Sequence, residues 1–205
     1  MKSPSRKMNM AQIAGLLLLL VVLPAGSWFY LQKGYEHRKA ALEELKDFGK
    51  VGDFELTDQF GRTLTNSALH QRVTIAGMLP GDAEGQKFWT WRLLEVKEQF
   101  DNRNEVCFLL FADTSAIPSL SAFSEEYGLT DSLQWELLPA SRDQVKQLFH
   151  LPDFQYLALA DTAAVVRRHY DITDNLQMGR LLEQVNIVLP RLPDPDIEFR
   201  RNREK

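Results

Sequence analysis

A single uncharged stretch near the N-terminus constrains this chain more than any other feature. Residues Ile13–Leu31 read IAGLLLLLVVLPAGSWFYL, 19 residues without a charged side chain. About 20 apolar residues in a helix cross the hydrocarbon core of a bilayer, so the stretch predicts a transmembrane anchor at residues 13–31. Trp28, Phe29 and Tyr30 close it, as aromatic side chains do at the boundary between lipid and water.

The same stretch also has the features of a secretory signal. Ile13–Leu23 is an apolar segment of suitable length, and Pro24-Ala25-Gly26-Ser27 supplies small residues at the spacing of a cleavage site. Under both interpretations the rest of the chain is exported. The aromatic residues at the end of the stretch favour an uncleaved anchor. The basic residues that flank the stretch orient it with residues 1–12 as a short cytoplasmic tail. We therefore expect a single-pass protein of the cell membrane whose main domain lies on the periplasmic or other extracytoplasmic side.

Composition and cysteine content exclude several classes of protein. Of 205 residues, 44% are hydrophobic and 25% are charged, which is typical of a globular domain. The formal net charge of -4 argues against nucleic acid as a partner. The chain has one cysteine, Cys107, which excludes an intramolecular disulfide, a redox pair of cysteines and any multi-thiolate metal site.

Helix-forming residues continue beyond the apolar stretch. Tyr35–Phe48 precedes Gly49 and is rich in Glu, Lys, Ala and Leu, which predicts a helical stalk within residues 32–50. At the other end of the chain, Pro190 and the prolines after it end the last predicted helix. Residues 191–205 are charged, and we expect them to form a mobile tail.

Between residues 51 and 190, short apolar runs alternate with amphipathic stretches, which indicates an α/β domain. The predicted strands are Asp53–Leu56, Arg62–Leu64, Arg72–Leu79, Glu105–Ala112, Leu133–Leu137, Gln155–Ala160 and Val165–Tyr170. The predicted helices are Gln86–Phe100, Ser119–Tyr127, Ser141–Phe149 and Asp174–Leu189. Two of the strands, Arg72–Leu79 and Glu105–Ala112, are almost continuously apolar, as central strands covered on both faces are.

Several segments, in this order, resemble the SCO/SenC family. The resemblance covers Val51 to Pro190 and is carried by Phe54–Gly61, Asp113 at a strand end, Trp135 with Leu137-Leu138, Leu159-Ala160-Asp161 and Val165–Asp171. It implies a thioredoxin-like central sheet flanked by helices, preceded by one transmembrane helix. It also implies kinship with membrane-anchored proteins linked to copper delivery and cytochrome c oxidase assembly.

The functional residues of that family are missing here. The family has two cysteines separated by three residues before its first long helix, and a histidine upstream of the later hairpin. Counted along this chain, the cysteine positions fall at Asp82 and Gln86 and the histidine position at Asp153, with His150 three residues away. A carboxylate and an amide cannot form a disulfide and match Cu(I) poorly. The resemblance thus implies a degenerate member that keeps the scaffold without its redox and copper site.

The loop after the first central strand remains the natural place for a site, because ligands of open α/β sheets bind beyond the carboxyl ends of strands. The candidate interaction surface comprises Met78, Leu79, Pro80, Gly81, Asp82, Glu84, Gly85 and Gln86, with Asp153 and His150. The plainer interpretation is that the two glycines serve the turn, while Asp82 and Glu84 cap the following helix.

Two further features bear on function. Phe88, Trp89 and Trp91 lie within four residues, so they cannot all face one stripe of a helix. At least one ring is therefore expected to be exposed beside the loop, and aromatic side chains are enriched at protein interfaces. Cys107 lies within a predicted central strand and is expected to pack in the core.

These observations predict a non-catalytic, membrane-anchored binding or assembly module, without a cofactor, whose partner is a protein of respiratory-complex biogenesis. An enzyme that uses Asp82 or Glu84 as a general base lacks a recognisable nucleophile. The alternative is a copper-binding chaperone with Met78, Cys107 and His150 as substitute ligands. That alternative requires the three side chains to lie close together in the fold.

Overall fold

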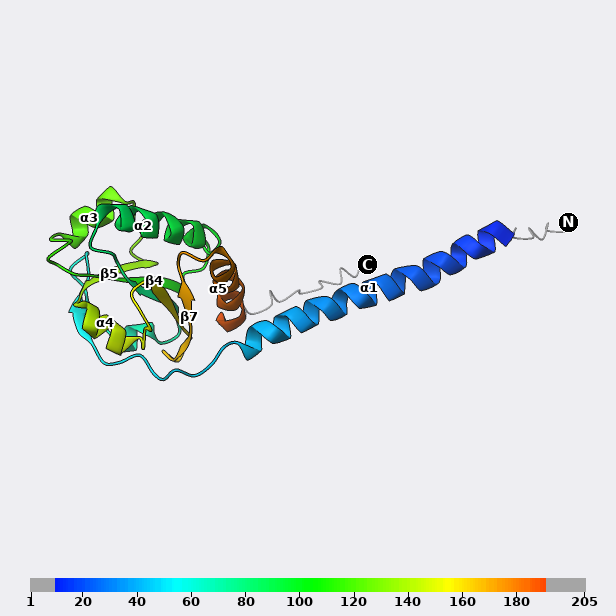
Figure 1. Ribbon diagram of the computed structural model, residues 1–205, viewed down its shortest axis with the longest axis horizontal. Helices are drawn as coiled ribbons and strands as arrows, with labels where there is room; N and C mark the ends of the chain where they lie inside the picture. The colour runs from blue at the N-terminus through cyan, green and yellow to red at the C-terminus, as the bar shows by residue number, and fades with distance from the viewer. Residues whose placement is uncertain (1–9, 191–205) are drawn as a thin grey trace, which may run out of the picture. The chain divides into compact units, whose positions relative to one another are not determined.

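The computed structural model describes residues 10–190, and the chain divides into two units between Glu44 and Leu45. The described part of the first unit is a single helix, α1 (Met10–Glu43), drawn in blue in Figure 1. Its Leu17–Glu43 portion is long and apolar enough to cross a membrane, judged by length and composition. Most of the predicted cytoplasmic tail, residues 1–9, and the predicted C-terminal tail, residues 191–205, lie outside the described residues.

The helix ends earlier than the stalk predicted over residues 35–48. Beyond Glu44 the chain is extended, and the backbone N–H groups of Lys46 and Phe48 donate to the carbonyls of Arg167 and Val166 at 2.9 and 3.0 Å. The segment therefore pairs with a strand edge of the second unit. The hydrogen bonds available at that edge outweigh the local helix propensity, which is a weak preference of well under 1 kcal/mol per residue.

The second unit is built on a five-stranded sheet in the order β5-β4-β3-β6-β7. Its strands are β3 (Val73–Met78), β4 (Val106–Ala112), β5 (Trp135–Pro139), β6 (Tyr156–Ala160) and β7 (Val166–Asp171). The first three are parallel to one another, and the last two are antiparallel to their neighbours. Both β3 and β4 are buried along their whole length, as their apolar sequences predict. A separate hairpin joins β1 (Glu55–Thr57) to β2 (Thr63–Thr65).

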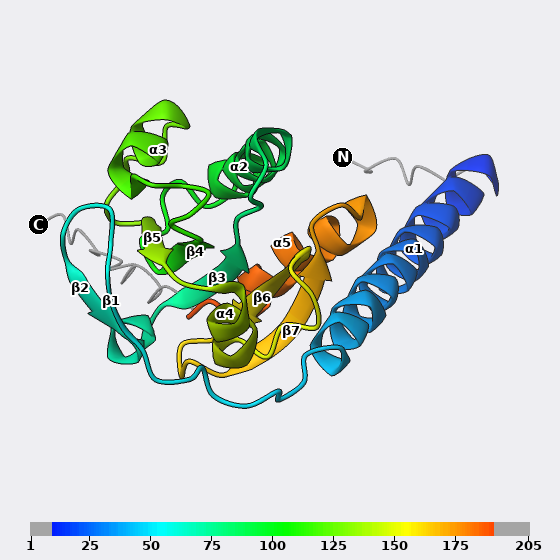
Figure 2. The same ribbon diagram turned by 60° about the vertical axis from the view of Figure 1, so that its left-hand side comes forward.

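Helices cover both faces of the sheet (Figure 2). One face packs against α2 (Ala83–Glu98), α3 (Leu120–Glu126) and α5 (Asn175–Val188), with Trp89 and Leu181 in that core. The other face packs against α4 (Arg142–Leu148), the hairpin and a short 3₁₀ helix, η1 (Asn66–Leu69), with Val145 and Leu69 in that core. The α/β class and the arrangement of helices around a central sheet are confirmed; η1 was not predicted.

Side-chain caps fix where the helices start. Ser119, Ser141 and Asp174 each accept a hydrogen bond from a backbone N–H in the first turn of the helix that follows. Such caps satisfy N–H groups that have no partner within the helix. The predicted helices at these three positions begin where a polar cap precedes an apolar periodic segment, and the structure has them there.

Because β3, β4 and β5 are parallel, their C-terminal ends lie together at one end of the sheet and their N-terminal ends at the other. These two ends are called the carboxyl edge and the amino edge below. At the carboxyl edge, defined by Met78, Ala112 and Pro139, the strands end and the loop to α2 begins. At the amino edge, defined by Val73 and Val106, the same strands start. Because a strand advances about 3.3 Å per residue, the six residue pairs that join β3 to β4 keep the two edges well over 10 Å apart.

Candidate functional site

The loop from β3 to α2 at the carboxyl edge is exposed only in part. Met78 and Leu79 are 1% and 2% exposed, and the Leu79 N–H donates to the Phe111 carbonyl at 2.8 Å. From Gly81 onward the loop reaches solvent. Of the predicted interaction surface, Met78 and Leu79 therefore belong to the core and offer no contact surface. The reason is that the strand alternation points Met78 into the same core as the side chains of α4.

Asp82, at the first expected cysteine position, is the N-cap of α2. Its Oδ2 accepts a hydrogen bond from the Gly85 N–H at 2.8 Å, and its carbonyl accepts from the Gln86 N–H at 3.0 Å. Glu84 lies in the first turn, where the helix dipole favours a negative charge. The carboxylate of Asp82 is thus used to start the helix, which agrees with the plainer interpretation of this loop.

Gly85 and Gln86 hold the end of the loop against its beginning at Pro80. A Cβ at Gly85 would lie 2.7 Å from Cβ of Pro80 and 3.0 Å from Oδ1 of Asp82, so the close approach of these segments requires glycine. Gln86, at the second expected cysteine position, is 8% exposed, and its Nε2 donates to the Pro80 carbonyl at 3.1 Å. At this position the chain has a buried amide that makes a structural hydrogen bond to the turn.

Arg142 is a neighbour of this loop that the sequence analysis did not single out. Its guanidinium lies 3.9 Å from where a Cβ of Gly81 would be and 5.2 Å from the centroid of the Phe154 ring, a cation–π arrangement. Its position follows from topology, because Arg142 comes just after β5 and so lies at the carboxyl edge. Asp153 precedes Phe154 and accepts its N–H at 2.7 Å; its place in a site with the β3–α2 loop stays a prediction.

Asp113, which follows β4, is another acid at this edge. Hydrogen bonds from the N–H and the hydroxyl of Ser115, at 2.9 and 2.7 Å, hold the pKa of Asp113 below its usual value, and the charge of Arg142 acts in the same direction. Asp113 therefore stays ionised at neutral pH. Its Oδ1 accepts both of these bonds within its own turn, and its lowered pKa makes Asp113 a weaker general base.

His150 does not join the loop. Its backbone is left-handed, with a φ of 52°, and its Nε2 lies 3.2 Å from the Lys50 carbonyl. Lys50 forms a bridge with Val165, so the segment around Lys50 lies on the outer side of β7. Strands β6 and β7 therefore separate this segment from β3. With strands about 4.8 Å apart, three spacings place this segment about 14 Å from β3. The prediction that His150 shares a surface with the β3–α2 loop is wrong.

The three substitute copper ligands are not brought together either. Met78 is the register partner of Phe111, whereas Cys107 pairs with Thr74, four residues earlier on β3. Four residues of strand separate Met78 and Cys107 by about 13 Å, and His150 lies beside the extended segment outside β7. Metal–ligand bonds are about 2–2.5 Å long, so Met78, Cys107 and His150 cannot hold one ion in this fold. Within residues 10–190 the structure has no group of three His, Cys, Asp or Glu side chains placed to share a metal.

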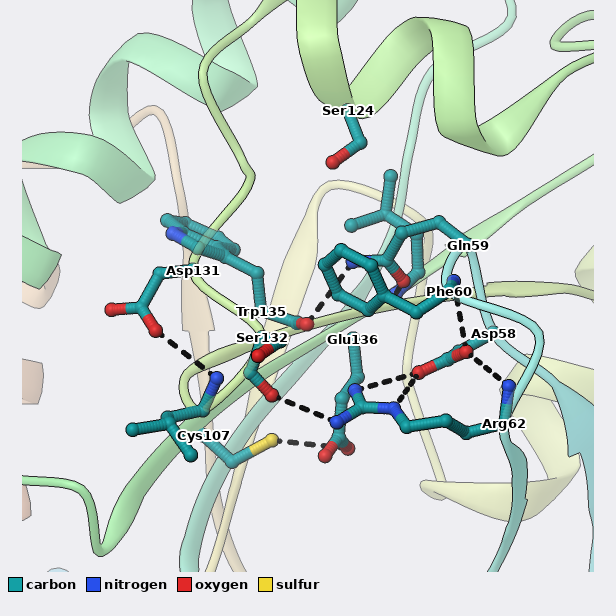
Figure 3. Close-up of polar contacts among 12 residues, drawn as sticks. Asp58, Gln59, Phe60, Arg62, Cys107, Ser124, Asp131, Ser132, Trp135 and Glu136 are labelled. Carbon is teal, nitrogen blue, oxygen red and sulfur yellow. Dashed lines mark hydrogen bonds and ion pairs between the residues drawn. The ribbon is translucent and has the colours of Figure 1, made fainter.

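Cys107 lies near the amino edge and is fully buried. Its thiol donates to Oε2 of Glu136 at 3.3 Å, and Oε1 of Glu136 is ion-paired with Arg72 at 2.6 Å. Burial, followed by the charge of Glu136, raises the pKa of the Cys107 thiol well above its usual value. The sole thiol of the chain is therefore a protonated, inaccessible core group (Figure 3), as its place in an apolar run predicted.

Figure 3 also shows how the β1–β2 hairpin is held against the sheet. The side-chain amide of Gln59 bonds the outer backbone edge of β5 twice, donating to the Trp135 carbonyl at 3.1 Å and accepting from the Leu137 N–H at 2.7 Å. Arg62 donates to the Ser132 carbonyl at 3.0 Å and is paired with the buried carboxylate of Asp58 at 2.6 Å. This clasp was not predicted, because it joins residues 70 or more positions apart in the sequence.

Of the three aromatic residues early in α2, only one is buried. Trp89 is 4% exposed, whereas Phe88 and Trp91 are 36% and 53% exposed. The rings of Phe88 and Trp91 are 6.2 Å apart, and the Arg92 guanidinium lies 5.7 Å from the Trp91 centroid. Phe88, Trp91 and Arg92 are called the aromatic patch below. The prediction that at least one ring is exposed on the helix after the loop is confirmed.

Comparison with known proteins finds likeness in structure alone. Protein-family profiles give no match, and neither do curated protein sequences. A SCO1/SenC family lipoprotein from Bacillus anthracis superposes with a TM-score of 0.58 at 16% identity, over 71% of this chain and 98% of that one. BsSco, described as a member of the Sco family of cytochrome c oxidase assembly proteins, gives 0.56 at 12% identity, over 70% and 96%.

A third similar structure is the thioredoxin domain of a thiol-disulfide oxidoreductase from Bacteroides vulgatus. It superposes with a TM-score of 0.53 at 13% identity, over 71% of this chain and 99% of that domain. The second unit therefore has the thioredoxin-like fold shared by SCO/SenC proteins and thiol-disulfide oxidoreductases. A chain with one cysteine fits a degenerate form of that fold, without a thiol pair.

Proposed function

We propose that this chain is a membrane-anchored, non-catalytic binding module that serves the assembly of a respiratory complex, such as cytochrome c oxidase. In this proposal α1 anchors the protein, and the thioredoxin-like unit stands on the extracytoplasmic side of the membrane. The unit holds a protein partner through surface contacts, without thiol exchange and without metal ligation by the degenerate loop.

The observation that carries the proposal is the aromatic patch, next to the loop where related folds do their chemistry. Trp91 is 53% exposed and Phe88 is 36% exposed, although both lie on a helix whose neighbouring Trp89 is buried. Large exposed rings beside an arginine are the residue types that contribute most to protein–protein binding. Exposure of the Phe88 and Trp91 rings to water is unfavourable, and a partner that covers them gains the free energy of burying two aromatic side chains.

The state of the loop supports a role without catalysis. Asp82 and Gln86 occupy the two expected cysteine positions and make structural hydrogen bonds, while Cys107 is buried near the opposite edge. Two of the similar structures are described as a SCO1/SenC family lipoprotein and as a member of the Sco family of cytochrome c oxidase assembly proteins. Those descriptions motivate the choice of a respiratory complex as the context in which to look for the partner.

The test is affinity capture of the tagged full chain from detergent-solubilised membranes of its host, with oxidase subunits identified by quantitative mass spectrometry. Trp91→Ala is expected to lower their recovery by about tenfold or more, the effect of removing an interface hot spot. Leu133→Ala is the matched control, because Leu133 is 57% exposed but lies before β5, near the amino edge. Equal recovery with Trp91→Ala and wild type, or no subunit enriched above background, contradicts the proposal.

A further inference from the structure

Two cations on α4 lie at the carboxyl edge without a counterion. Arg142 and Lys146 are four residues apart, and both are exposed. Within residues 10–190, neither side chain forms an ion pair or donates a hydrogen bond. Like charges at this spacing repel each other on a helix, so the arrangement is unfavourable for α4 on its own. An anion from outside would remove this cost.

One aromatic ring positions both cations. The Arg142 guanidinium lies 5.2 Å from the centroid of the Phe154 ring, and the Lys146 ammonium lies 5.9 Å from it. These cation–π contacts restrict two long, flexible side chains before a partner arrives. Less conformational entropy is then lost on binding. Arg142, Lys146 and Phe154 are called the basic site below.

The basic site lies beside the loop from β3 to α2. The antiparallel register of β3 with β6, continued four residues beyond the last pair, places Phe154 opposite Pro80. The next residue of the loop, Gly81, has no side chain, and a Cβ there would lie 3.9 Å from Nη2 of Arg142. This glycine therefore leaves the guanidinium uncovered on the side of the loop.

The acids nearest in the fold and the sequence do not neutralise the basic site. Asp113 is close enough for the charge of Arg142 to lower its pKa, but its Oδ1 accepts two hydrogen bonds within its own turn. Asp153 likewise uses Oδ1 to accept a backbone N–H of its own loop. Asp143, the next residue of α4, forms no ion pair with either cation in the chain from residue 10 to residue 190. The two positive charges are thus available to a partner.

The spacing of the two cations fits an extended segment. Residues i and i+4 of a helix lie about 6 Å apart on one face, and residues i and i+2 of an extended chain point to the same side about 7 Å apart. Two acidic side chains separated by one residue therefore reach both cations at once. The chain beyond residue 31 is acidic overall, with 21 basic against 28 acidic residues, so such a segment is favoured at the basic site over the surface in general.

We infer that the basic site binds an extended, acidic segment of the partner protein, in which two carboxylates are separated by one residue. The Arg142 fork would hold one carboxylate and the Lys146 ammonium the other. The inference rests on the proposed binding function and adds the chemistry of the partner. It uses a surface separate from the aromatic patch, because the basic site is on α4 and the patch is on α2.

The experiment uses the ¹⁵N-labelled full chain in neutral detergent micelles and three end-blocked, seven-residue peptides of glycine and serine. The first carries two glutamates separated by one residue, and the second has glutamine at the same two positions. The third has two glutamates separated by four residues. Titration followed by amide chemical shifts should show the first peptide binding about fivefold more tightly than the second and about twofold more tightly than the third. The shifts should centre on residues 142–146 and 154.

Charge variants test the two cations. Arg142→Gln and Lys146→Gln should each weaken the first peptide by about twofold, and the double variant should bind it no better than the second peptide. Arg103→Gln is the matched control, because it removes the same charge just before β4, near the amino edge. It should leave the preference for the first peptide unchanged. Unchanged amide shifts of β3 and β4 show that each variant is folded.

A variant without a charge change tests the geometry. Gly81 does not have a positive φ, and a Cβ there makes only ordinary contacts, 3.7 Å from Cβ of Ala116. Gly81→Leu should therefore fold and cover the open side of the Arg142 guanidinium. It is expected to weaken the first peptide by about twofold or more, although every charge remains in place.

Equal binding of the first and second peptides, or shifts centred away from the basic site, overturns the inference. A preference for the first peptide that the double variant retains, or that Arg103→Gln removes, also overturns it. Trp91→Ala should bind the peptides as wild type does, so loss of membrane capture in that variant tests the proposed function separately. If the peptides bind as described but no oxidase subunit is captured, the basic site stands and the proposed function fails.

Discussion

The two edges of the parallel strands use polar residues in opposite ways. At the carboxyl edge, Asp82 is exposed and caps α2, and Gln86 hydrogen-bonds the turn beside it. Near the amino edge, Cys107, Glu136 and Arg72 form a chain of contacts in which the thiol and the carboxylate are almost wholly buried. The carboxyl edge is thus built as a turn and a helix cap, and the one thiol of the chain is buried in the core near the amino edge.

The contrast teaches that residue type alone does not mark a reactive group. A thiol reacts as the thiolate, which needs solvent access and a lowered pKa, and Cys107 has neither. The Asp82 carboxylate has access, but it is satisfied by the N–H groups that begin α2. Three changes test whether the two edges differ as described and a fourth tests burial on β7; they are taken from the largest expected effect to the smallest.

The first compares thiol reactivity at the two edges. Cys107 is expected to react with a thiol reagent at least about a thousandfold more slowly in the folded protein than in denaturant, because reaction requires an opening that costs about 5 kcal/mol or more. Asp82→Cys in a Cys107→Ser background is the control, and its thiol should react at the rate of an exposed cysteine. Rapid labelling of native Cys107, measured by mass spectrometry, would show that this thiol is not a core group.

The second breaks the buried ion pair. Glu136→Ala leaves Arg72 without its carboxylate and should lower the free energy of unfolding by about 2–3 kcal/mol, toward the lower end for such pairs because the Arg72 side chain is 21% exposed. Guanidinium denaturation of the full chain in micelles measures it, and Glu136→Gln should be the milder change. A loss below about 0.5 kcal/mol, the range of ordinary surface substitutions, is inconsistent with a structural pair.

The third removes the cap at the carboxyl edge. Asp82→Ala should cost about 1 kcal/mol of unfolding free energy, the usual effect of losing an N-cap, and so less than Glu136→Ala. Asp82→Asn keeps a side-chain oxygen for the Gly85 N–H and should remain close to wild type. If Asp82→Asn is as unstable as Asp82→Ala, the carboxylate does more than cap the helix.

The fourth concerns acid sensitivity at the β7 side of the sheet. Burial, with His150 adding to it, holds the pKa of His169 below its usual value. The unfolded chain therefore binds this proton more readily, so stability contributed by neutral His169 is lost as the pH falls below about 6.5. His169→Gln should flatten the fall in melting temperature between pH 7 and pH 5. A slope unchanged by the substitution argues against a buried neutral imidazole.

The sequence was sufficient to predict the strands of the central sheet, the β1–β2 hairpin and helices α2 to α5, because their signals are local. The apolar runs of β3 and β4 and the polar caps at Ser119, Ser141 and Asp174 each act within a few residues. The end of α1 at Glu43 was not predicted, since the bonds of Lys46 and Phe48 to β7 join segments about 120 residues apart. Local helix propensity contains no information about such a partner.

The candidate site was predictable only where it depends on loop chemistry. A glycine-containing loop with Asp82 before a helix indicates a cap, and three aromatics within four residues indicate an exposed ring. The placement of His150 failed because its distance along the sequence from Asp153 says nothing of which side of the sheet it reaches. Arg142, Gln59 and the pair of Arg72 with Glu136 became visible only through the order and register of the strands.

The central claim is that this thioredoxin-like unit works by binding, without its thiol. The most direct measurement is the amount of assembled cytochrome c oxidase in membranes of cells that lack this chain and are complemented with single variants at matched expression. The account predicts that Cys107→Ser restores the oxidase to the wild-type level, and that Trp91→Ala does not. Loss of the oxidase with folded Cys107→Ser, together with full recovery with Trp91→Ala, would contradict it.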